Sequence, residues 1–253
     1  MQHISRDDTG AVAHIAMTVP ARLNALSDGM IAALHSELDG IAADASIKVV
    51  IISGEGKAFC AGHNLKEMQA KDTNALADLF ARCAALMARI QSLPQPVIAQ
   101  VHGIATAAGC QLVATCDLAI ADEAAKFGVN GVNIGLFCST PMVALTRNIP
   151  RKAAFEMLTT GRFISAQEAV TFGLINKAVP TDQLAQETRD LAQTIAGKLQ
   201  SAVKTGKSAF YTQAQMGTAD AYAYTGQIMT ENMADADTQE GICAFLEKRP
   251  PNW

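Results

Sequence analysis

Two segments made mostly of small residues are the parts of this sequence best suited to chemistry. They are Ala58–Lys66, which reads AFCAGHNLK, and Gly103–Gln111, which reads GIATAAGCQ. Each follows an apolar, β-branched run and leads into a helical pattern, so each is expected to place unpaired backbone N–H groups at a helix start. Small side chains let a ligand approach that backbone closely. If the two segments converge, their N–H groups form an oxyanion hole, which stabilises negative charge developing on an oxygen.

The same residues also admit a purely structural interpretation. Glycine and alanine occur wherever a helix packs tightly on a strand, and a single glycine-rich turn is a weak indication of function. The residues alone leave the two interpretations equally open.

The elements that would position these segments alternate between strand and helix. Apolar, β-branched or alternating patterns predict strands at 11–18, 47–53, 97–101 and 117–121, and an extended segment at 174–179. Helical spacing predicts helices at 27–43, from about 66 to 93, at 110–115, at 151–160 and, after a capping box at Ser165–Glu168, up to Gly173. Residues 122–150 are predicted to be mostly irregular. This alternation favours parallel strand pairing with right-handed crossovers, an α/β fold.

The pattern after Pro180 is helical throughout. Helices are predicted at 182–199, 202–215, 219–236 and 239–248. Because the composition changes near residue 190, we predict an α/β core over residues 1–190 and an all-helical region over residues 191–253.

Composition and charge exclude several partners. Of the 253 residues, 49% are apolar and 17% charged, and the net charge is −4 with no basic cluster. Nucleic acid is therefore not an expected partner, and the longest apolar runs are too short to span a bilayer. The first residues show no apolar signal core, so we expect a cytoplasmic protein. The six cysteines fit no zinc spacing, so no metal is expected and the thiols are predicted to be free and buried.

A resemblance extends over nearly the whole chain, in register. Arg22–Leu26, Gly56–Met68, Pro96–Gln111, Leu158–Gly161 and Glu240–Pro251 are similar, in this order, to the active-site and C-terminal motifs of the crotonase (enoyl-CoA hydratase/isomerase) superfamily. The resemblance implies a spiral of ββα turns, with C-terminal helices that build a homo-oligomer, a trimer or a hexamer. It also implies an acyl-CoA thioester substrate; the coenzyme A is part of that substrate, and no separate cofactor is expected.

The resemblance also assigns roles by motif position. The thioester carbonyl is expected between the backbone N–H groups of His63 and Ala108, a role that needs no particular side chain. Phe245 and Lys248 are expected to reach a neighbouring subunit's coenzyme A. The remaining substrate-binding residues implied in this way are Arg22, Leu23, Ala25, Ala61, Gly62, Asn64, Leu65, Lys66, Ala107, Asn130 and Asn133.

One departure from the family pattern bears on activity. Hydratases hold and deprotonate water with two carboxylates, and these catalytic positions fall at Gln111 and Gly131 here. Neither residue exchanges protons near neutral pH, so a step worth roughly a hundred- to ten-thousand-fold is missing at each position. We therefore expect an enoyl-CoA hydratase-type protein, a lyase or isomerase by descent, with poor hydratase activity. It would perform another enolate reaction, namely isomerisation, decarboxylation or thioester chemistry, or bind acyl-CoA without reaction as a regulator of lipid metabolism. A peptidase is set aside because no serine stands at position 111.

Other groups near these motifs are candidates to exchange protons in place of the two carboxylates. His63 titrates near neutrality, but its backbone is expected to matter more than its side chain, which would pack or face solvent. Asp117 is expected to be a buried, hydrogen-bonded cap. Cys138 and Ser139 should line the acyl pocket, where no adjacent base is identifiable.

Overall fold

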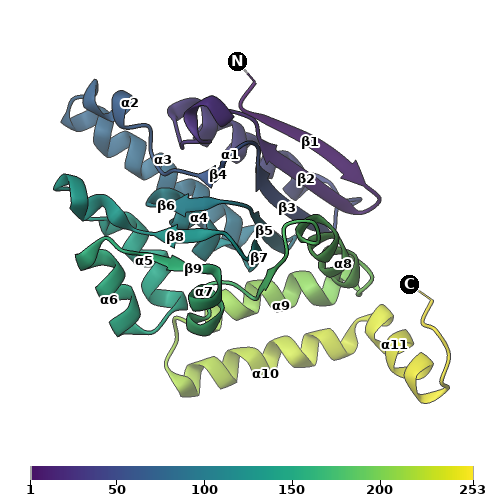
Figure 1. The fold of residues 1–253 in the computed structure, drawn as a ribbon. Coiled ribbons are helices and arrows are strands. Elements are labelled where there is room, and N and C mark those ends of the chain that lie inside the picture. The colour runs from purple at the N-terminus through teal and green to yellow at the C-terminus, as the bar shows by residue number, and fades with distance from the viewer. Residues whose placement is uncertain (1, 253) are drawn as a thin grey trace.

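The computed structural model describes residues 2–252. In this part of the chain the strands form two sheets, and the chain passes back and forth between them (Figure 1). The larger sheet has the order β1-β2-β3-β5-β7-β10 and the smaller one β4-β6-β8-β9. The strands are β1 Ile4–Thr9, β2 Val12–Met17, β3 Val49–Gly54, β4 Ala58–Cys60, β5 Val97–Val101, β6 Ile104–Thr106, β7 Leu118–Asp122, β8 Lys126–Gly128, β9 Phe163–Ser165 and β10 Lys177–Val179.

Each repeat of the spiral gives one strand to each sheet. The pairs β3 and β4, β5 and β6, and β7 and β8 follow one another closely, and a helical segment then returns the chain to the next pair. Neighbouring strands run parallel, except for β1 with β2 and β8 with β9. The register pairs Val50 with Val97 and Ile98 with Leu118, so the buried strands stack their apolar side chains across the sheet.

Helices cover the faces of these sheets and form the C-terminal region. They are α1 Asp28–Ala43, α2 Leu65–Gln69, α3 Thr73–Ser92, α4 Ala108–Thr115, α5 Ser139–Asn148, α6 Arg151–Thr160, α7 Ala166–Phe172, α8 Leu184–Ala196, α9 Gln200–Gln213, α10 Thr218–Ala234 and α11 Ala236–Leu246, with short 3-10 turns η1 Pro20–Arg22 and η2 Asn130–Ile134. The capping box of α7 is present, with Glu168 N donating to Ser165 Oγ (3.2 Å) and Ser165 N donating to Glu168 Oε2 (2.9 Å).

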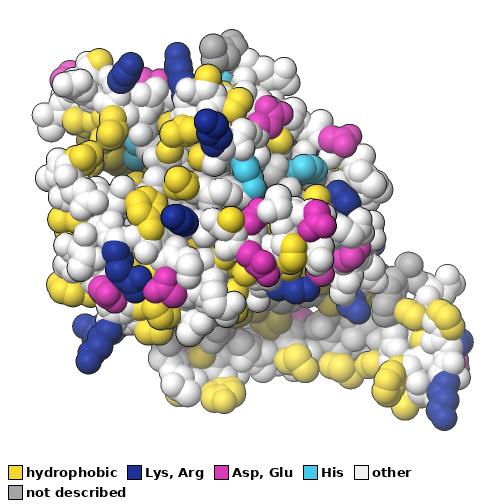
Figure 2. Space-filling view, in the orientation of Figure 1, with side chains coloured by type: hydrophobic (Ala, Val, Ile, Leu, Met, Phe, Trp, Pro, Cys, Tyr) yellow, Lys and Arg dark blue, Asp and Glu magenta, His cyan; other side chains and the backbone are white. Residues whose placement is uncertain are grey.

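The last two helices lie beneath the body of the molecule (Figure 1). Within the described residues, α10 has no buried side chain and α11 buries only Ala244. Hydrophobic side chains gather along this lower edge (Figure 2), where Tyr222, Phe245 and Leu246 are each at least 73% exposed. An apolar surface of this extent is typical of an interface with another chain.

The predicted boundary at residue 190 falls inside α8. That helix packs on the larger sheet, where Ala192 joins a buried cluster with Val12, Val49 and Ile98. The division into two units stays a prediction, although the α/β class and the C-terminal helices are as expected.

Several local predictions need correction. The segment 122–150, expected to be irregular, contains β8, η2 and the ten-residue helix α5. The helix expected from 66 to 93 is two helices, α2 and α3, because Asp72 caps a new start by accepting from Ala75 N (2.8 Å). Cys243 is exposed, whereas the other five cysteines are buried; all six are free thiols.

No helix within residues 2–252 is long and apolar enough to cross a membrane. The same part of the chain holds no group of three or more His, Cys, Asp or Glu side chains arranged to bind a metal ion.

Candidate active site

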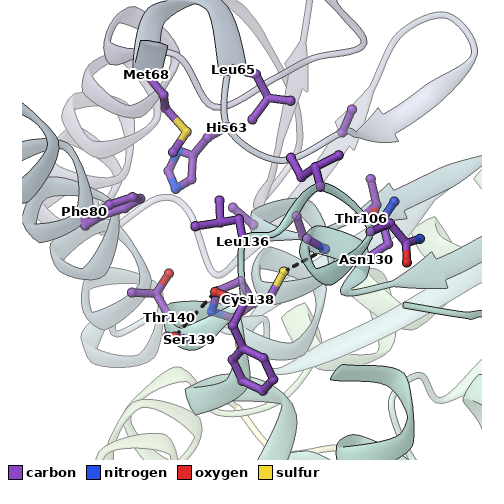
Figure 3. A pocket seen from close by; sticks show the side chains of 18 residues that line it. His63, Leu65, Met68, Phe80, Thr106, Asn130, Leu136, Cys138, Ser139 and Thr140 are labelled. Atoms are coloured by element: carbon purple, nitrogen blue, oxygen red, sulfur yellow. Dashed lines mark hydrogen bonds between the residues drawn. The ribbon is translucent and has the colours of Figure 1, made fainter. Parts of the chain in front are cut away.

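A cavity of about 390 Å³ lies where the two small-residue segments meet (Figure 3). The segments form one part of its wall; α2, α3, η2 and the start of α5 form the rest. Eighteen residues, mostly apolar, line it: Ala61, His63, Leu65, Met68, Phe80, Thr106, Ala107, Ala108, Asn130, Gly131, Asn133, Ile134, Leu136, Phe137, Cys138, Ser139, Thr140 and Pro141.

The first segment is fixed by backbone hydrogen bonds to the loop before α1. Ala61 N donates to Leu23 O (3.0 Å), and Leu26 N donates to Gly62 O (2.8 Å). Gly62 has φ +85°, a conformation that favours glycine. These constraints turn the chain between β4 and α2 so that His63 faces the cavity.

The second segment is fixed at the start of α4. Ala107 N donates to Gly128 O (2.9 Å), and Ala107 takes the unusual φ of +50°. Ala108 is the first helical residue, so its N–H has no acceptor in its own helix. A Cβ at Gly109 would lie 2.0 Å from Cys60 O, which shows how closely the helix start approaches β4.

The two segments touch. A Cβ at Gly62 would lie 3.3 Å from Ala108 N and 3.1 Å from Thr106 O. Across residues 2–252, neither the His63 N–H nor the Ala108 N–H has a backbone acceptor. Two unpaired amides therefore stand on adjoining stretches of one cavity wall, an arrangement that suits an anionic oxygen.

The His63 side chain packs, as expected, and it also lines the cavity. Its ring meets Phe80 edge-on with 5.6 Å between centroids, and Nδ1 lies 3.1 Å from Leu26 O. Its Nε2 is buried without a partner among the described residues. Burial lowers the pKa of this imidazole below its ordinary value of 6.5.

Gln111 and Gly131 differ in their relation to the cavity. Gln111 is 5% exposed, lies on α4 outside the lining residues, and leaves its Oε1 without a partner in the described structure. Gly131 does line the cavity. A Cβ there would lie 2.2 Å from Leu136 O and 2.9 Å from Cys138 Sγ, so the space where a side chain would begin is already filled.

The predicted residues Asn130 and Asn133 line the cavity but are engaged with protein. Asn130 Oδ1 accepts from Thr106 Oγ1 (2.6 Å), and Asn133 Nδ2 donates to Gly161 O (3.5 Å). Their amides hold η2 in place beside the second segment.

The residues after His63 begin α2. Asn64 caps this helix by accepting from Lys66 N (3.1 Å). Lys66 is exposed and does not line the cavity. Leu65 is 55% exposed and does line the cavity.

The loop predicted to meet coenzyme A borders the first segment without lining the cavity. Arg22, Leu23 and Ala25 surround the buried Asn24, whose Nδ2 donates to Glu55 O and Ala58 O (both 2.9 Å). The loop is thereby tied to the chain that enters β4.

Phe245 and Lys248 are not brought to the cavity within one chain. Phe245 lies on α11, at the opposite side of the molecule from α2 and α5 (Figure 1), and is 82% exposed. Lys248 follows the same helix. Their expected role concerns a neighbouring subunit and stays a prediction.

Most of the apolar wall was not predicted from the sequence. Met68 ends a motif assigned to the family's active site but was given no role there, Phe80 was not singled out, and Leu136 belonged to a segment predicted to be irregular. Cys138 and Ser139 line the cavity as expected. No pattern in the sequence distinguishes a helix face that meets a cavity from one that meets the core.

Comparisons with known proteins agree with this architecture. The model of the enoyl-CoA hydratase/isomerase family matches residues 7–253. The chain therefore belongs to the enoyl-CoA hydratase/isomerase family, and its fold is the crotonase fold expected from the sequence.

The relatives indicate a particular branch of that family. The mitochondrial enoyl-CoA hydratase domain-containing protein 3 of Xenopus laevis is 48% identical over 96% of this chain and 83% of that protein. The crystal structure of human enoyl-CoA hydratase domain-containing protein 3 has a TM-score of 0.97 at 45% identity, covering 100% of each chain. An enoyl-CoA hydratase of Mycobacterium smegmatis has a TM-score of 0.98 at 49% identity, covering 100% of this chain and 99% of that one.

The expected cytoplasmic location is wrong. The relatives from Xenopus laevis, Mus musculus and Homo sapiens, at 47–48% identity, are all named as mitochondrial proteins. The expectation rested on the lack of a signal in the first residues, and such a lack does not decide the compartment.

Proposed function

We propose that this protein binds acyl-CoA thioesters and polarises the thioester carbonyl between the backbone amides of His63 and Ala108. The observation that carries the proposal is the pair of unpaired N–H groups on touching segments of the cavity wall. Negative charge grows on the thioester oxygen as an enolate forms, and two fixed amide dipoles stabilise that charge more than they stabilise the substrate. Each such donor contributes on the order of a hundred- to a thousand-fold in rate.

The small residues around the amides serve the same purpose. Ala61, Gly62 and Ala107 leave the backbone accessible, and Asn130 and Asn133 hold η2, the part of the cavity wall beside the second segment. The Arg22–Ala25 loop contacts the nucleotide end of the coenzyme A. In a trimer or hexamer built through the C-terminal helices, Phe245 and Lys248 reach the coenzyme A of a neighbouring subunit.

Efficient hydration of an enoyl thioester is not part of the proposal. Gln111 and Gly131 stand at the positions expected for the hydratase carboxylates, and none of the eighteen residues lining the cavity in the described chain is acidic. The protein performs an enolate reaction that needs no carboxylate pair, with isomerisation, decarboxylation and thioester chemistry as the candidates. The lack of an acidic lining residue equally favours a second candidate function, binding of acyl-CoA without reaction.

Titration calorimetry with coenzyme A and a series of acyl-CoAs tests the binding proposal, and a crotonyl-CoA absorbance assay tests the prediction of poor hydration. Binding of acyl-CoA with slow hydration is the expected result. Turnover of a panel of enoyl- and malonyl-type thioesters then separates an enzyme from a binding protein. Fast hydration of crotonyl-CoA by the wild-type protein contradicts the assignment of Gln111 and Gly131.

A matched pair of glycine variants tests the oxyanion hole itself. Gly62→Ala adds a methyl group 2.9 Å from Ala107 Cβ, 3.1 Å from Thr106 O and 3.3 Å from Ala108 N, at a backbone of φ +85°. Gly10→Ala adds one at φ +60° in a turn with nothing within 4 Å. Both variants strain a left-handed residue, so both lose stability. We expect only Gly62→Ala to lose acyl-CoA affinity or turnover, by tenfold or more; equal losses in both variants contradict the proposed hole.

A further inference from the structure

His63 is the one group lining the cavity that can accept a proton at neutral pH. Among the eighteen lining residues in the described chain, only His63 and Cys138 have side chains of a type whose ordinary pKa lies near neutral or mildly alkaline pH. Burial raises the pKa of the Cys138 thiol, and its sulfur already accepts from Gly131 N (3.4 Å). Cys138 therefore remains a neutral, occupied thiol.

The hydrogen bond to Leu26 defines which nitrogen of His63 carries the proton. A carbonyl oxygen can only accept, so Nδ1 must be the donor in the 3.1 Å contact with Leu26 O. In the neutral ring Nε2 then bears a lone pair, and it can only accept.

The charges around the ring leave it neutral. Burial lowers the pKa of His63, and the hydrogen bond to the Leu26 carbonyl and then the Asp28 carboxylate act against this. Asp28, however, is paired with Lys71 (2.6 Å) and with Arg82 (2.7 Å), so its field at the ring is largely compensated.

The unpaired Nε2 belongs to the apolar part of the cavity. The ring lies with Met68 and Phe80, across the cavity from Thr106 and Asn130 (Figure 3). The His63 ring can therefore contact a part of the ligand that lies away from the wall containing Asn130 and Gly131. Methionine is the most adaptable apolar side chain, so Met68 can shift to admit a group to the buried nitrogen.

We propose that His63 Nε2 accepts a hydrogen bond from a hydroxyl group on the distal acyl chain, so that the preferred ligand is a hydroxylated acyl-CoA. This inference rests on the proposed acyl-CoA function. The buried acceptor has no partner in the described protein, and buried polar atoms are nearly always paired in a functioning complex. A charged acyl group is disfavoured, because none of the lining residues carries a fixed charge.

The test compares octanoyl-CoA with its isomers hydroxylated at positions 4 to 8, using titration calorimetry on the full-length protein. 3-Hydroxyoctanoyl-CoA serves as the comparator for a hydroxyl near the thioester. We expect at least one distal isomer to bind about tenfold more tightly than octanoyl-CoA. The ratio of the two affinities is the measured quantity, so a general weakening of binding does not affect it.

Three variants at one position separate the two nitrogens of the ring. His63→Asn retains a donor near Nδ1 for Leu26 O and lacks an acceptor at Nε2. His63→Gln places an amide near Nε2 and loses the bond to Leu26. His63→Phe keeps only the packing on Phe80. The preference for the hydroxyl should disappear in His63→Asn and His63→Phe and persist in part in His63→Gln.

The pH dependence has a definite sign. Protonation removes the lone pair of Nε2, so the preference should be complete above pH 6.5 and should be lost as the pH falls through the lowered pKa of His63. Octanoyl-CoA, which makes no such bond, should not show this loss.

The failures are distinguishable. If octanoyl-CoA binds but no hydroxylated isomer is preferred, or if the preference survives in His63→Asn and His63→Phe, this inference is wrong and the proposed function stands. If no acyl-CoA binds at all, the proposed function is wrong and this inference falls with it.

Discussion

Two buried polar sites in this protein are built in opposite ways. Beneath α9, Lys207 Nζ donates to Ile90 O (2.8 Å), Gln95 O (3.0 Å) and Asp117 Oδ2 (2.6 Å), which uses all three of its protons. Asp117 also accepts from Tyr211 OH (2.8 Å). Each charged atom has a partner, and the network joins the C-terminal helices to the central sheet.

The cavity is the reverse case. Across the described residues, Nε2 of His63, which lines the cavity, is buried without a partner, as is Oε1 of Gln111 on α4 outside the lining residues; Gln95 Oε1 and Ser201 Oγ are further such atoms elsewhere in the fold. Leaving such an atom unpaired costs about 1–3 kcal/mol in the absence of a ligand. A buried charge with all its partners in place stabilises a fold, whereas an unpaired acceptor that lines a cavity, as His63 Nε2 does, is available to a ligand. The first site is therefore structural, as expected for Asp117, and the second is the candidate functional site.

The largest predicted effect is the loss of stability when the Lys207 network is broken. In Lys207→Met the carboxylate of Asp117 loses its buried counter-ion, and we expect the free energy of unfolding to fall by about 3–5 kcal/mol. Chemical denaturation at a fixed protein concentration measures it, because assembly contributes to apparent stability.

Lys204→Met is the matched control. Lys204 is on the same helix, exposed, and one turn before Lys207. It should change stability by no more than about 0.5 kcal/mol. A small loss in Lys207→Met as well means that the buried network is not an anchor, and the contrast between the two sites then disappears.

A smaller effect concerns the closed space at Gly131. Gly131→Ala directs a methyl group against Leu136 O and Cys138 Sγ, and we expect a loss of about 1–3 kcal/mol from overpacking. Gly40→Ala, on the exposed face of α1 with nothing within 4 Å, should instead gain about 0.5–1 kcal/mol. Thermal melts of the pair measure the difference.

The same geometry limits how hydratase activity is restored. Replacing both Gln111 and Gly131 by glutamate puts carboxylates at the two positions expected for them in a hydratase. A glutamate at 131 must first displace the Leu136 carbonyl. We expect Gly131→Glu to disrupt the cavity and reduce acyl-CoA binding. Unchanged binding together with new hydratase activity in the double variant contradicts this, because it means that the segment after η2 moves to make room for the glutamate.

What the sequence predicted is mostly what short patterns encode. Helix 151–160 and strand 97–101 were placed at their observed bounds, and the capping box at Ser165 formed, because hydrophobic period and cap chemistry act locally. Helix α5 was missed because Ser139, Thr140 and Pro141 are typical loop residues, although proline is tolerated in a first helical turn.

The site was predicted in part for a similar reason. Family resemblance located the two segments, but whether a side chain fits at Gly131 depends on the path of Leu136, and whether Gln111 has a partner depends on all its neighbours. These are tertiary facts. Family resemblance predicts which carboxylate positions are changed, whereas the sequence gives no information about what occupies the space at Gly131.

The smallest predicted effect tests the unpaired amide of Gln111. Gln111→Met replaces it with an apolar side chain of similar length, and methionine adapts to an irregular space. Removing a buried acceptor that has no partner should leave stability unchanged or raise it by about 1 kcal/mol, measured by chemical denaturation. Gln111→Glu should do the opposite, since it buries a carboxylate without a counter-ion.

The direction of change in Gln111→Met decides between two accounts of the cavity. If the free energy of unfolding rises or stays the same in Gln111→Met, the unpaired amide costs stability in the folded protein. Such a cost is expected of an atom that binds a ligand, and equally of one that stands where a hydratase has a carboxylate. A loss of more than 1 kcal/mol means that Oε1 is already satisfied in solution. In that event His63 Nε2 alone distinguishes the cavity from the network at Lys207. The contrast between unpaired and paired buried atoms is then tested by the His63 variants.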